Sequence, residues 1–279
     1  MPVKDARLLL PRPRLAGLIA CLLVRDTRGR ELASDERFSF YPASPLCGVA
    51  WAPVGKGFLV DANGQIGPEP VPSVSFFGST PRPNAGWTDG PAFGAFVILF
   101  PEAWRTLSGR EAGAFRERVV PLDEAMGPTL ASIFGEPGWE QNCEAAFDRL
   151  QDALTPLWSQ SLGPTGSLPW LGDWVRRLGV SAARVGARQF QRRVKGWTGR
   201  AQRDLAIHAR AEALFAHTQS EPGESFAEMA AAMGYADQSH MIREVKRVTG
   251  HPPAKMLELI ETYERFWFYR LMAEHFRGE

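Results

Sequence analysis

Histidine is absent from the first 207 residues of this 279-residue sequence, because all five histidines come later, at positions 208, 217, 240, 251 and 275. An enzymatic metal centre takes clustered imidazoles together with carboxylates. The sequence also has no glycine-rich phosphate loop, cysteine cluster or nucleophile elbow. We therefore expect no metal, no cofactor and no catalytic residue, and the chain is not predicted to be an enzyme.

Cysteines and long apolar runs are scarce as well. Cys21, Cys47 and Cys143 are odd in number and widely spaced, which favours reduced, buried thiols over a disulfide framework. No apolar run approaches the roughly 20 residues that span a bilayer. The leucine run near the N-terminus is broken by Pro11 and Pro13 and makes a poor signal peptide. We expect a cytoplasmic protein with no membrane partner.

Acidic residues are missing from one stretch of the chain. Residues 174–203 hold nine Lys or Arg and no Asp or Glu, although the formal net charge of the whole chain is only +1. An ordinary solvated face would mix the two signs. A basic block of this kind is the electrostatic pattern expected of a surface that contacts phosphates.

Proline and glycine are dense in the first 100 residues, which hold 12 Pro and 11 Gly. This density divides the chain into short segments and argues against long helices. Strand-like apolar runs lie between the breaks, at residues 18–24, 47–51, 58–60, 74–77 and 95–100. We predict a small antiparallel barrel or sandwich up to about residue 105, ending in a short helix at 101–107.

The middle of the chain indicates where one domain ends. Residues 139–158 have the pattern of an amphipathic helix, which would pack on the strands or pair with a second subunit. Residues 159–167 are rich in Gly, Ser and Pro and make a good linker. The predicted organisation is a β-rich domain at 1–158, this linker, and a second domain with the basic block at 168–279.

The most specific pattern lies at residues 225–253. Ser225 and Glu228 have the spacing of a capping box, and Gly234 suits the left-handed end of a helix. Asp237 then favours the start of a second helix, which Gly250 would end. An ordinary helical hairpin with a solvated polar face would share these features.

The string GYADQSHMIREVKRVTGHPP resembles the second helix-turn-helix of the AraC/XylS family of transcriptional regulators. It shares the signature G-[FY]-x-D-Q-S-H, an arginine at 243, a Lys-Arg pair and the ending Gly-x-x-Pro. The resemblance is close from about residue 168 onwards and loose before it. It implies an α+β multidomain fold. The N-terminal domain would be a mostly antiparallel, cupin-like barrel with flanking helices, and the C-terminal domain all-α with two helix-turn-helix units. The implied function is that of a bacterial transcription factor that regulates transcription by sequence-specific binding to double-stranded DNA.

The first helix-turn-helix is expected upstream, with its recognition helix within 185–199 and Ser181 or Gly186 at its start. A helix at 200–215 would bridge the two units. The resemblance and the side-chain chemistry together select the DNA contacts. The base-reading candidates are Arg188, Gln191, Arg192, Gln238, Ser239 and Arg243. The phosphate candidates are Arg193, Lys195, Arg200, Lys246 and Arg247.

In this family the N-terminal barrel senses a ligand or dimerises. The resemblance therefore implies a small-molecule effector, a homodimer and, for an activator, RNA polymerase as further partners. The candidate effector pocket is lined by Trp51, Phe58, Phe76, Phe77, Trp87 and Phe96, side chains that would equally serve to fill a core. We expect the aromatic residues of the tail to pack on the helical domain, with a dimer contact as the alternative; they are Tyr263, Phe266, Trp267 and Tyr269.

Two other function classes stay open. A metal-free cupin-type enzyme with a DNA-binding tail would act on a small molecule without its helical domain. A protein-interaction adaptor would show no salt-dependent DNA binding.

Overall fold

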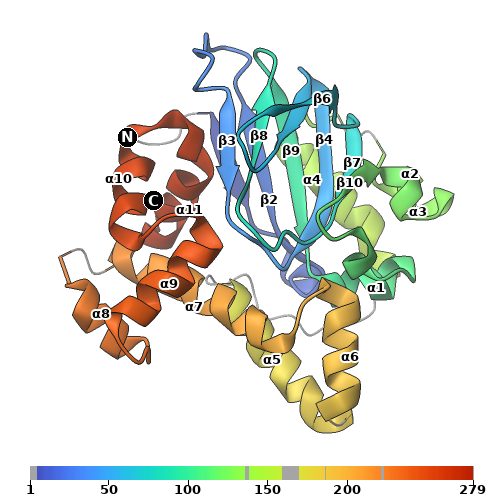
Figure 1. Ribbon diagram of the computed structural model, residues 1–279. Helices are drawn as coiled ribbons and strands as arrows, with labels where there is room; N and C mark the ends of the chain where they lie inside the picture. The colour runs from blue at the N-terminus through green and yellow to red at the C-terminus, as the bar shows by residue number, and fades with distance from the viewer. Residues whose placement is uncertain (1–4, 136–137, 159–169, 186, 221–222, 279) are drawn as a thin grey trace.

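The structure, a computed structural model, describes residues 5–135, 138–158, 170–185, 187–220 and 223–278 (Figure 1). A β-rich part, residues 5–158, lies beside a helical part, residues 170–278. The strands are β1 (Ala6–Leu9), β2 (Ile19–Asp26), β3 (Phe38–Tyr41), β4 (Cys47–Val54), β5 (Gly57–Val60), β6 (Ile66–Pro70), β7 (Val74–Phe77), β8 (Asn84–Thr88), β9 (Phe93–Leu99) and β10 (Val119–Pro121).

The strands form two antiparallel sheets. Within the described residues the larger sheet has the order β1-β2-β9-β4-β7-β10 and the smaller β3-β8-β5-β6. The five predicted runs correspond to β2, β4, β5, β7 and β9, so the expected mostly antiparallel β architecture is confirmed. The other five strands were not predicted, because they are short and carry no continuous apolar run: β6, for example, reads IGPEP and is largely exposed.

Helices cover one face of the larger sheet. They are α1 (Pro101–Ser108), α2 (Leu122–Ala125), α3 (Pro128–Ile133) and α4 (Cys143–Leu154), with 3-10 turns η1 (Pro13–Leu15), η2 (Ala112–Phe115) and η3 (Thr155–Leu157). The apolar side of α4, including Phe147 and Leu150, is buried in the same core cluster as Val97 and Leu99 of β9. The amphipathic helix predicted at 139–158 therefore packs on the strands of its own chain.

The helices of the helical part are α5 (Trp170–Val185), α6 (Ala187–Thr198), α7 (Gln202–Ser220), α8 (Phe226–Ala232), α9 (Gln238–Thr249), α10 (Pro253–Thr262) and α11 (Trp267–Arg277), with a 3-10 turn η4 (Glu264–Phe266) between the last two. The first two of them, α5 and α6, make the first helix-turn-helix. Ser181 lies inside α5, so it does not start the recognition helix. The alternative start, Gly186, and the predicted linker at 159–167 lie outside the described residues.

The second helix-turn-helix has the end signals that its residues predict. The Ser225 hydroxyl accepts from the amide of Glu228, and the Glu228 carboxylate accepts from the Ser225 amide, which completes the capping box of α8. The Asp237 carboxylate accepts from the His240 amide at 2.6 Å and caps α9. Gly234 and Gly250 have φ values of +71° and +88°, which glycine adopts without steric cost.

None of the helices in the described ranges combines the length and the apolar character needed to cross a membrane.

Candidate nucleic-acid interface and pocket

The second recognition-type helix, α9, has one buried side and one exposed polar side. Met241, Val245 and Val248 are at most 6% exposed and fix the helix against its neighbours. The exposed side carries every candidate predicted for it: Gln238, Ser239, Arg243, Lys246 and Arg247. Within the described residues Arg243 has no hydrogen-bond or ion-pair partner, whereas Arg247 pairs with Asp204 of α7 at 3.1 Å.

A partly buried ion pair holds α9 against the bridging helix α7. Arg210 of α7 donates from Nε and Nη2 to the two carboxylate oxygens of Glu244, at 3.0 and 2.6 Å, and its guanidinium lies over the ring of Tyr235. His240 adds a contact to the same carboxylate at 3.4 Å. Bidentate pairs of this kind constrain orientation as well as distance, so Arg210 fixes how α9 presents its exposed side.

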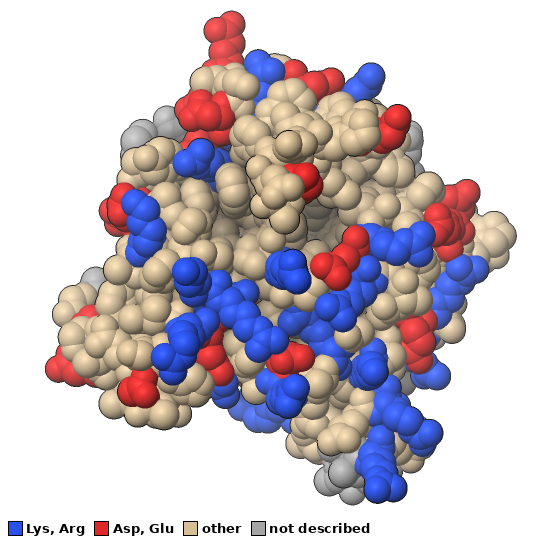
Figure 2. Space-filling view, viewed as in Figure 1, with Lys and Arg blue, Asp and Glu red and all other residues tan. Residues whose placement is uncertain are grey.

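The first recognition-type helix, α6, also has one buried side and one exposed polar side. Phe190 and Val194 are almost fully buried, while the exposed positions include Arg188, Gln191, Arg192, Arg193 and Lys195. Figure 2 shows lysine and arginine gathered across the middle of this face of the molecule, over both parts, and continuing to the lower right end of the helical part. The acid-free stretch thus places exposed cations on α6, and their contact with phosphates stays a prediction.

The β-rich part contacts the C-terminal ends of both recognition-type helices. Ser79 donates through its hydroxyl to the carbonyl of Thr198, the last residue of α6, at 2.7 Å. The amide of Ala43 donates to the carbonyl of Val248 near the end of α9 at 2.8 Å. We call residues 43–44 and 79–83 the contact segments; a β-bridge between Ser44 and Thr80 joins them. One continuous piece of the β-rich part thus touches both helices.

Arg200 requires a correction, because it does not lie on the exposed basic surface. It is 6% exposed and donates from Nη2 to the Thr80 carbonyl at 2.6 Å and from Nη1 to Nε2 of His208 at 2.5 Å. Burial lowers its pKa to about 10. Burial and the Arg200 charge together lower the pKa of His208 to about 3. In this arrangement Arg200 joins the two parts of the chain and cannot reach a phosphate.

A cavity of about 950 Å³ lies between the two sheets and opens towards the helical part. Its walls include β3, β8 and β9, the contact segments, and residues of α7, α9 and α11. Of the six predicted pocket residues, Phe58, Phe77, Trp87 and Phe96 line it. The candidate ligand site is therefore shared between the β-rich and the helical parts.

Trp51 and Phe76 do not line this cavity, which corrects their prediction. Trp51 stacks near Phe134 and donates from its indole to the carbonyls of Phe134 and Gly135. Phe76 stacks on Trp104 of α1 at 4.3 Å. Alternate side chains of a strand point to opposite faces, and these two point to the face of the larger sheet that the helices cover.

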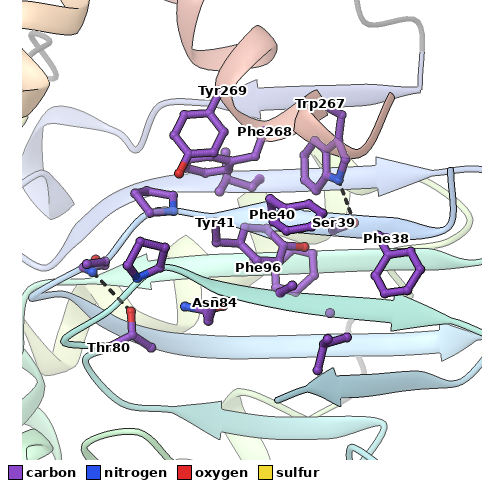
Figure 3. Close-up of a pocket in the computed structure, with 18 of the residues that line it drawn as sticks. Phe38, Ser39, Phe40, Tyr41, Thr80, Asn84, Phe96, Trp267, Phe268 and Tyr269 are labelled. Atoms are coloured by element: carbon purple, nitrogen blue, oxygen red, sulfur yellow. Dashed lines mark hydrogen bonds between the residues drawn. The ribbon is translucent and has the colours of Figure 1, made fainter. Parts of the chain in front are cut away.

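The tail forms a wall of the cavity that sequence reasoning missed. Phe268 and Tyr269 of α11 lie near Phe40 and Tyr41 of β3 (Figure 3), and Trp267 donates from its indole to the Ser39 hydroxyl at 2.8 Å. The aromatic density of the tail was the only sequence signal. Its residues pack across the two parts rather than on the helical part alone.

An ion cluster fixes this tail to the β-rich part. The Glu264 carboxylate faces Arg25, Arg30 at 3.2 Å and Arg270 at 3.3 Å. Burial opposes ionisation of Glu264, but these three cations outweigh it and lower its pKa. Among the described residues, no group of three or more His, Cys, Asp or Glu is arranged to hold a metal ion.

Comparison with known proteins finds a helix-turn-helix domain model that matches residues 180–258. No curated protein matches the chain. Among solved structures, ToxT from Vibrio cholerae shares 12% identity over 85% of this chain and 98% of its own, with a TM-score of 0.41. ToxT with a bound unsaturated fatty acid shares 14% over 85% and 94%, with a TM-score of 0.40. The AraC-like transcriptional activator CuxR shares 12% over 96% and 91%, with a TM-score of 0.28.

Proposed function

We propose that the chain is a transcriptional regulator of the AraC type whose DNA binding responds to a small molecule held in the cavity, because residues 180–258 match a helix-turn-helix domain. The helices α6 and α9 enter the major groove of double-stranded DNA. Arg188, Gln191, Arg192, Gln238, Ser239 and Arg243 read base edges. Arg193, Lys195, Lys246 and Arg247 contact phosphates.

The exposed side of α9 carries this proposal. Gln238 lies in the first turn of the helix, and Arg243 is five residues on, about 140° around a helix of 3.6 residues per turn. The two side chains therefore read different base pairs. A glutamine amide pairs with adenine N6 and N7, and an arginine fork pairs with guanine O6 and N7. The buried stripe and the Arg210–Glu244 pair hold both in place.

Selection of bound fragments from a random duplex pool tests the proposal, with wild type and Arg243→Ala in parallel. We expect a defined consensus for wild type. The variant should lose about 1–3 kcal/mol on that sequence and relax preference at one position, because a single base contact is removed. Non-specific duplexes should be affected much less. An unchanged consensus with uniformly weaker binding would assign Arg243 to the backbone, and no retained fragments from wild type would refute DNA recognition.

The cavity supports the effector part of the proposal. Three of the pocket-facing positions on the larger sheet, Ala50, Ala52 and Gly94, carry a methyl group or no side chain, which leaves space between the sheets. Enclosed, mostly apolar cavities with a few polar groups are typical ligand sites. ToxT has been solved with an unsaturated fatty acid, which makes fatty acids one class to assay, by their effect on operator affinity.

These assignments give each segment of the chain its own function. Residues 1–158 sense the effector or dimerise, 159–167 link, and 168–279 bind DNA. We further propose a homodimer as one operating state, RNA polymerase as the partner if the protein activates, and the cytoplasm as its location, because its DNA target lies there. Sedimentation with and without operator measures the oligomeric state.

A further inference from the structure

We propose that the cavity binds a flat aromatic molecule, and that the C-terminal segment beyond the helix-turn-helix domain, through Phe268, forms part of that ligand site. This inference rests on the proposed effector function only in treating the cavity as a ligand site. It names the chemical class that the walls select.

Two rings of the larger sheet lie flat along it because their neighbours are glycines. A Cβ on Gly48 would lie 2.4 Å from Cζ of Phe77, and a Cβ on Gly94 would lie 3.1 Å from Cε2 of Phe96. A ring in this position has one face on the sheet and leaves the other towards the cavity. The two glycines therefore maintain aromatic faces on this wall that a flat ligand can stack against.

Small side chains keep the space above these rings open. Ala50 and Ala52 line the cavity from β4 and extend no further than Cβ. Gly86 of β8, on the smaller sheet, has only the Phe58 carbonyl near the position of a Cβ, at 3.6 Å. A space between two sheets with aromatic rings along one wall suits a flat molecule that can stack on those rings.

Further rings come from elements far away in the chain. Tyr41 of β3 and Phe268 of α11 pack edge to face with centroids 5.7 Å apart, and both line the cavity together with Phe96 (Figure 3). Phe268 lies ten residues beyond the matched helix-turn-helix domain, which ends at 258. The ligand site is thus completed by the tail.

The charged groups of the walls are mostly engaged with other groups. Arg25 pairs with Glu264, Arg118 pairs with Glu124 at 2.7 Å, and Arg37 donates to the carbonyls of Leu32 and Asp89. Asn84 of β8 lines the cavity (Figure 3), and its side-chain amide has no hydrogen-bond partner among the described residues. One amide among aromatic faces matches a ligand with a single neutral polar group, such as a hydroxyl.

A matched pair of ligands tests the flatness of the site. 2-Naphthol and decahydro-2-naphthol have the same carbon skeleton and one hydroxyl, but only the first is flat and aromatic. We expect isothermal titration of the full chain to show 2-naphthol binding about tenfold more tightly, since each ring pair contributes about 0.5–1.5 kcal/mol beyond burial. Equal affinities, or no binding of either compound, would overturn the aromatic assignment.

Ring-removing variants test the walls. Phe96→Leu and Phe268→Leu should each weaken 2-naphthol about two- to tenfold and leave decahydro-2-naphthol unchanged. Phe226→Leu, which removes a half-buried ring of α8 outside the cavity, is the control and should change neither. A Phe268→Leu variant that is folded, as shown by an unchanged melting temperature, and binds like wild type removes the tail from the site.

Two further measurements distinguish an aromatic ligand from an acyl chain, and a failure of this inference from a failure of the proposed function. A cis-9-hexadecenoate that binds more tightly than 2-naphthol and is insensitive to both variants would assign the cavity to an acyl chain instead. Salt-dependent binding of the same preparations to duplex DNA is measured alongside. Retained DNA binding with failed ligand binding refutes this inference alone, whereas lost DNA binding in wild type refutes the proposed function.

Discussion

Two arginines of the same basic block have opposite environments. Arg193 is exposed on α6, and Arg200, seven residues later, is buried against Thr80 and His208. Each phosphate that a protein neutralises adds about 0.9 to the slope of log K against log salt. Arg193→Ala should therefore flatten this slope by about 0.9 and weaken binding to all duplexes alike. Filter binding at four salt concentrations measures it.

Arg200→Ala is the matched comparison. If Arg200 stays buried when DNA binds, this substitution should leave the slope of log K against log salt unchanged. It should instead destabilise the fold, since the His208 ring loses its buried donor and the Thr80 carbonyl keeps only the Ser44 amide as donor. If Arg200→Ala flattens the slope as much as Arg193→Ala, then Arg200 leaves its buried position when DNA binds.

For single residues, the sequence predicts which side chains are candidates for ligand or DNA contacts, but it does not predict the direction in which each side chain points. The period of a strand divides Phe76 from Phe77, yet both faces of the larger sheet are covered, so apolar residues occur on both. Phe77 lines the cavity and Phe76 the core. Arg200 shows the same limit, because only the tertiary contact with Thr80 separates it from the exposed arginines beside it.

The helices α1 and α5 meet at a carboxyl group that should make stability depend on pH. Glu102 accepts from the Trp174 indole at 2.7 Å, and burial raises its pKa to about 7. The folded state therefore binds this proton more tightly than the unfolded chain, whose value is near 4.5. The free energy of unfolding should fall as pH rises from 4.5 to above 7.

Glu102→Gln isolates this contribution, because an amide can still accept from the indole and does not ionise. We expect the wild type to lose roughly 1–3 kcal/mol relative to the variant between pH 5 and pH 8. Urea unfolding of both proteins at the two pH values gives the difference. If the free energies of unfolding of the two proteins change equally with pH, burial does not keep the Glu102 carboxyl group protonated.

Element ends are predicted well where the signal is local. The capping box at Ser225, the cap at Asp237 and the glycine at 250 all define helix ends within four residues, and the structure has each of them. The strand β3 and the helix α11 depend instead on each other, through contacts such as Tyr41 with Phe268 at 5.7 Å. No local pattern contains that information, and the tail's role in the cavity was missed for this reason.

The contact segments join the β-rich part to the ends of α6 and α9. An engineered disulfide that holds this contact closed, and that reduction opens, tests its effect on DNA binding. A Cβ on Gly250 would lie 3.7 Å from Cβ of Pro83, close to the roughly 3.8 Å of a disulfide. With Pro83→Cys and Gly250→Cys combined, oxidation should weaken DNA binding about 5- to 150-fold, the usual range of coupling between sites. The physical reason is that Arg200 and the ends of α6 and α9 then stay bound to the β-rich part.

Reduction of the same sample should restore binding and serves as the control for folding. Each single variant is also needed, because Gly250 has φ +88° and any side chain there introduces strain. The three native cysteines are buried, so they should not compete for the new disulfide. Equal DNA affinity before and after reduction would mean that the joined arrangement already binds DNA fully.

The packing of α11 against the first strands has a consequence for synthesis on the ribosome. Ala6, Leu8, Cys21 and Leu23 share a core cluster with Trp267, Leu271 and Met272. At about 5–20 residues per second, β2 and α11 emerge on the order of ten to fifty seconds apart. During that interval the apolar side of β1 and β2 lacks the cover that α11 gives it. The nascent chain must spend this time shielded by chaperones or in a looser state, and substitutions that make this side more apolar should reduce soluble yield before they affect the finished protein.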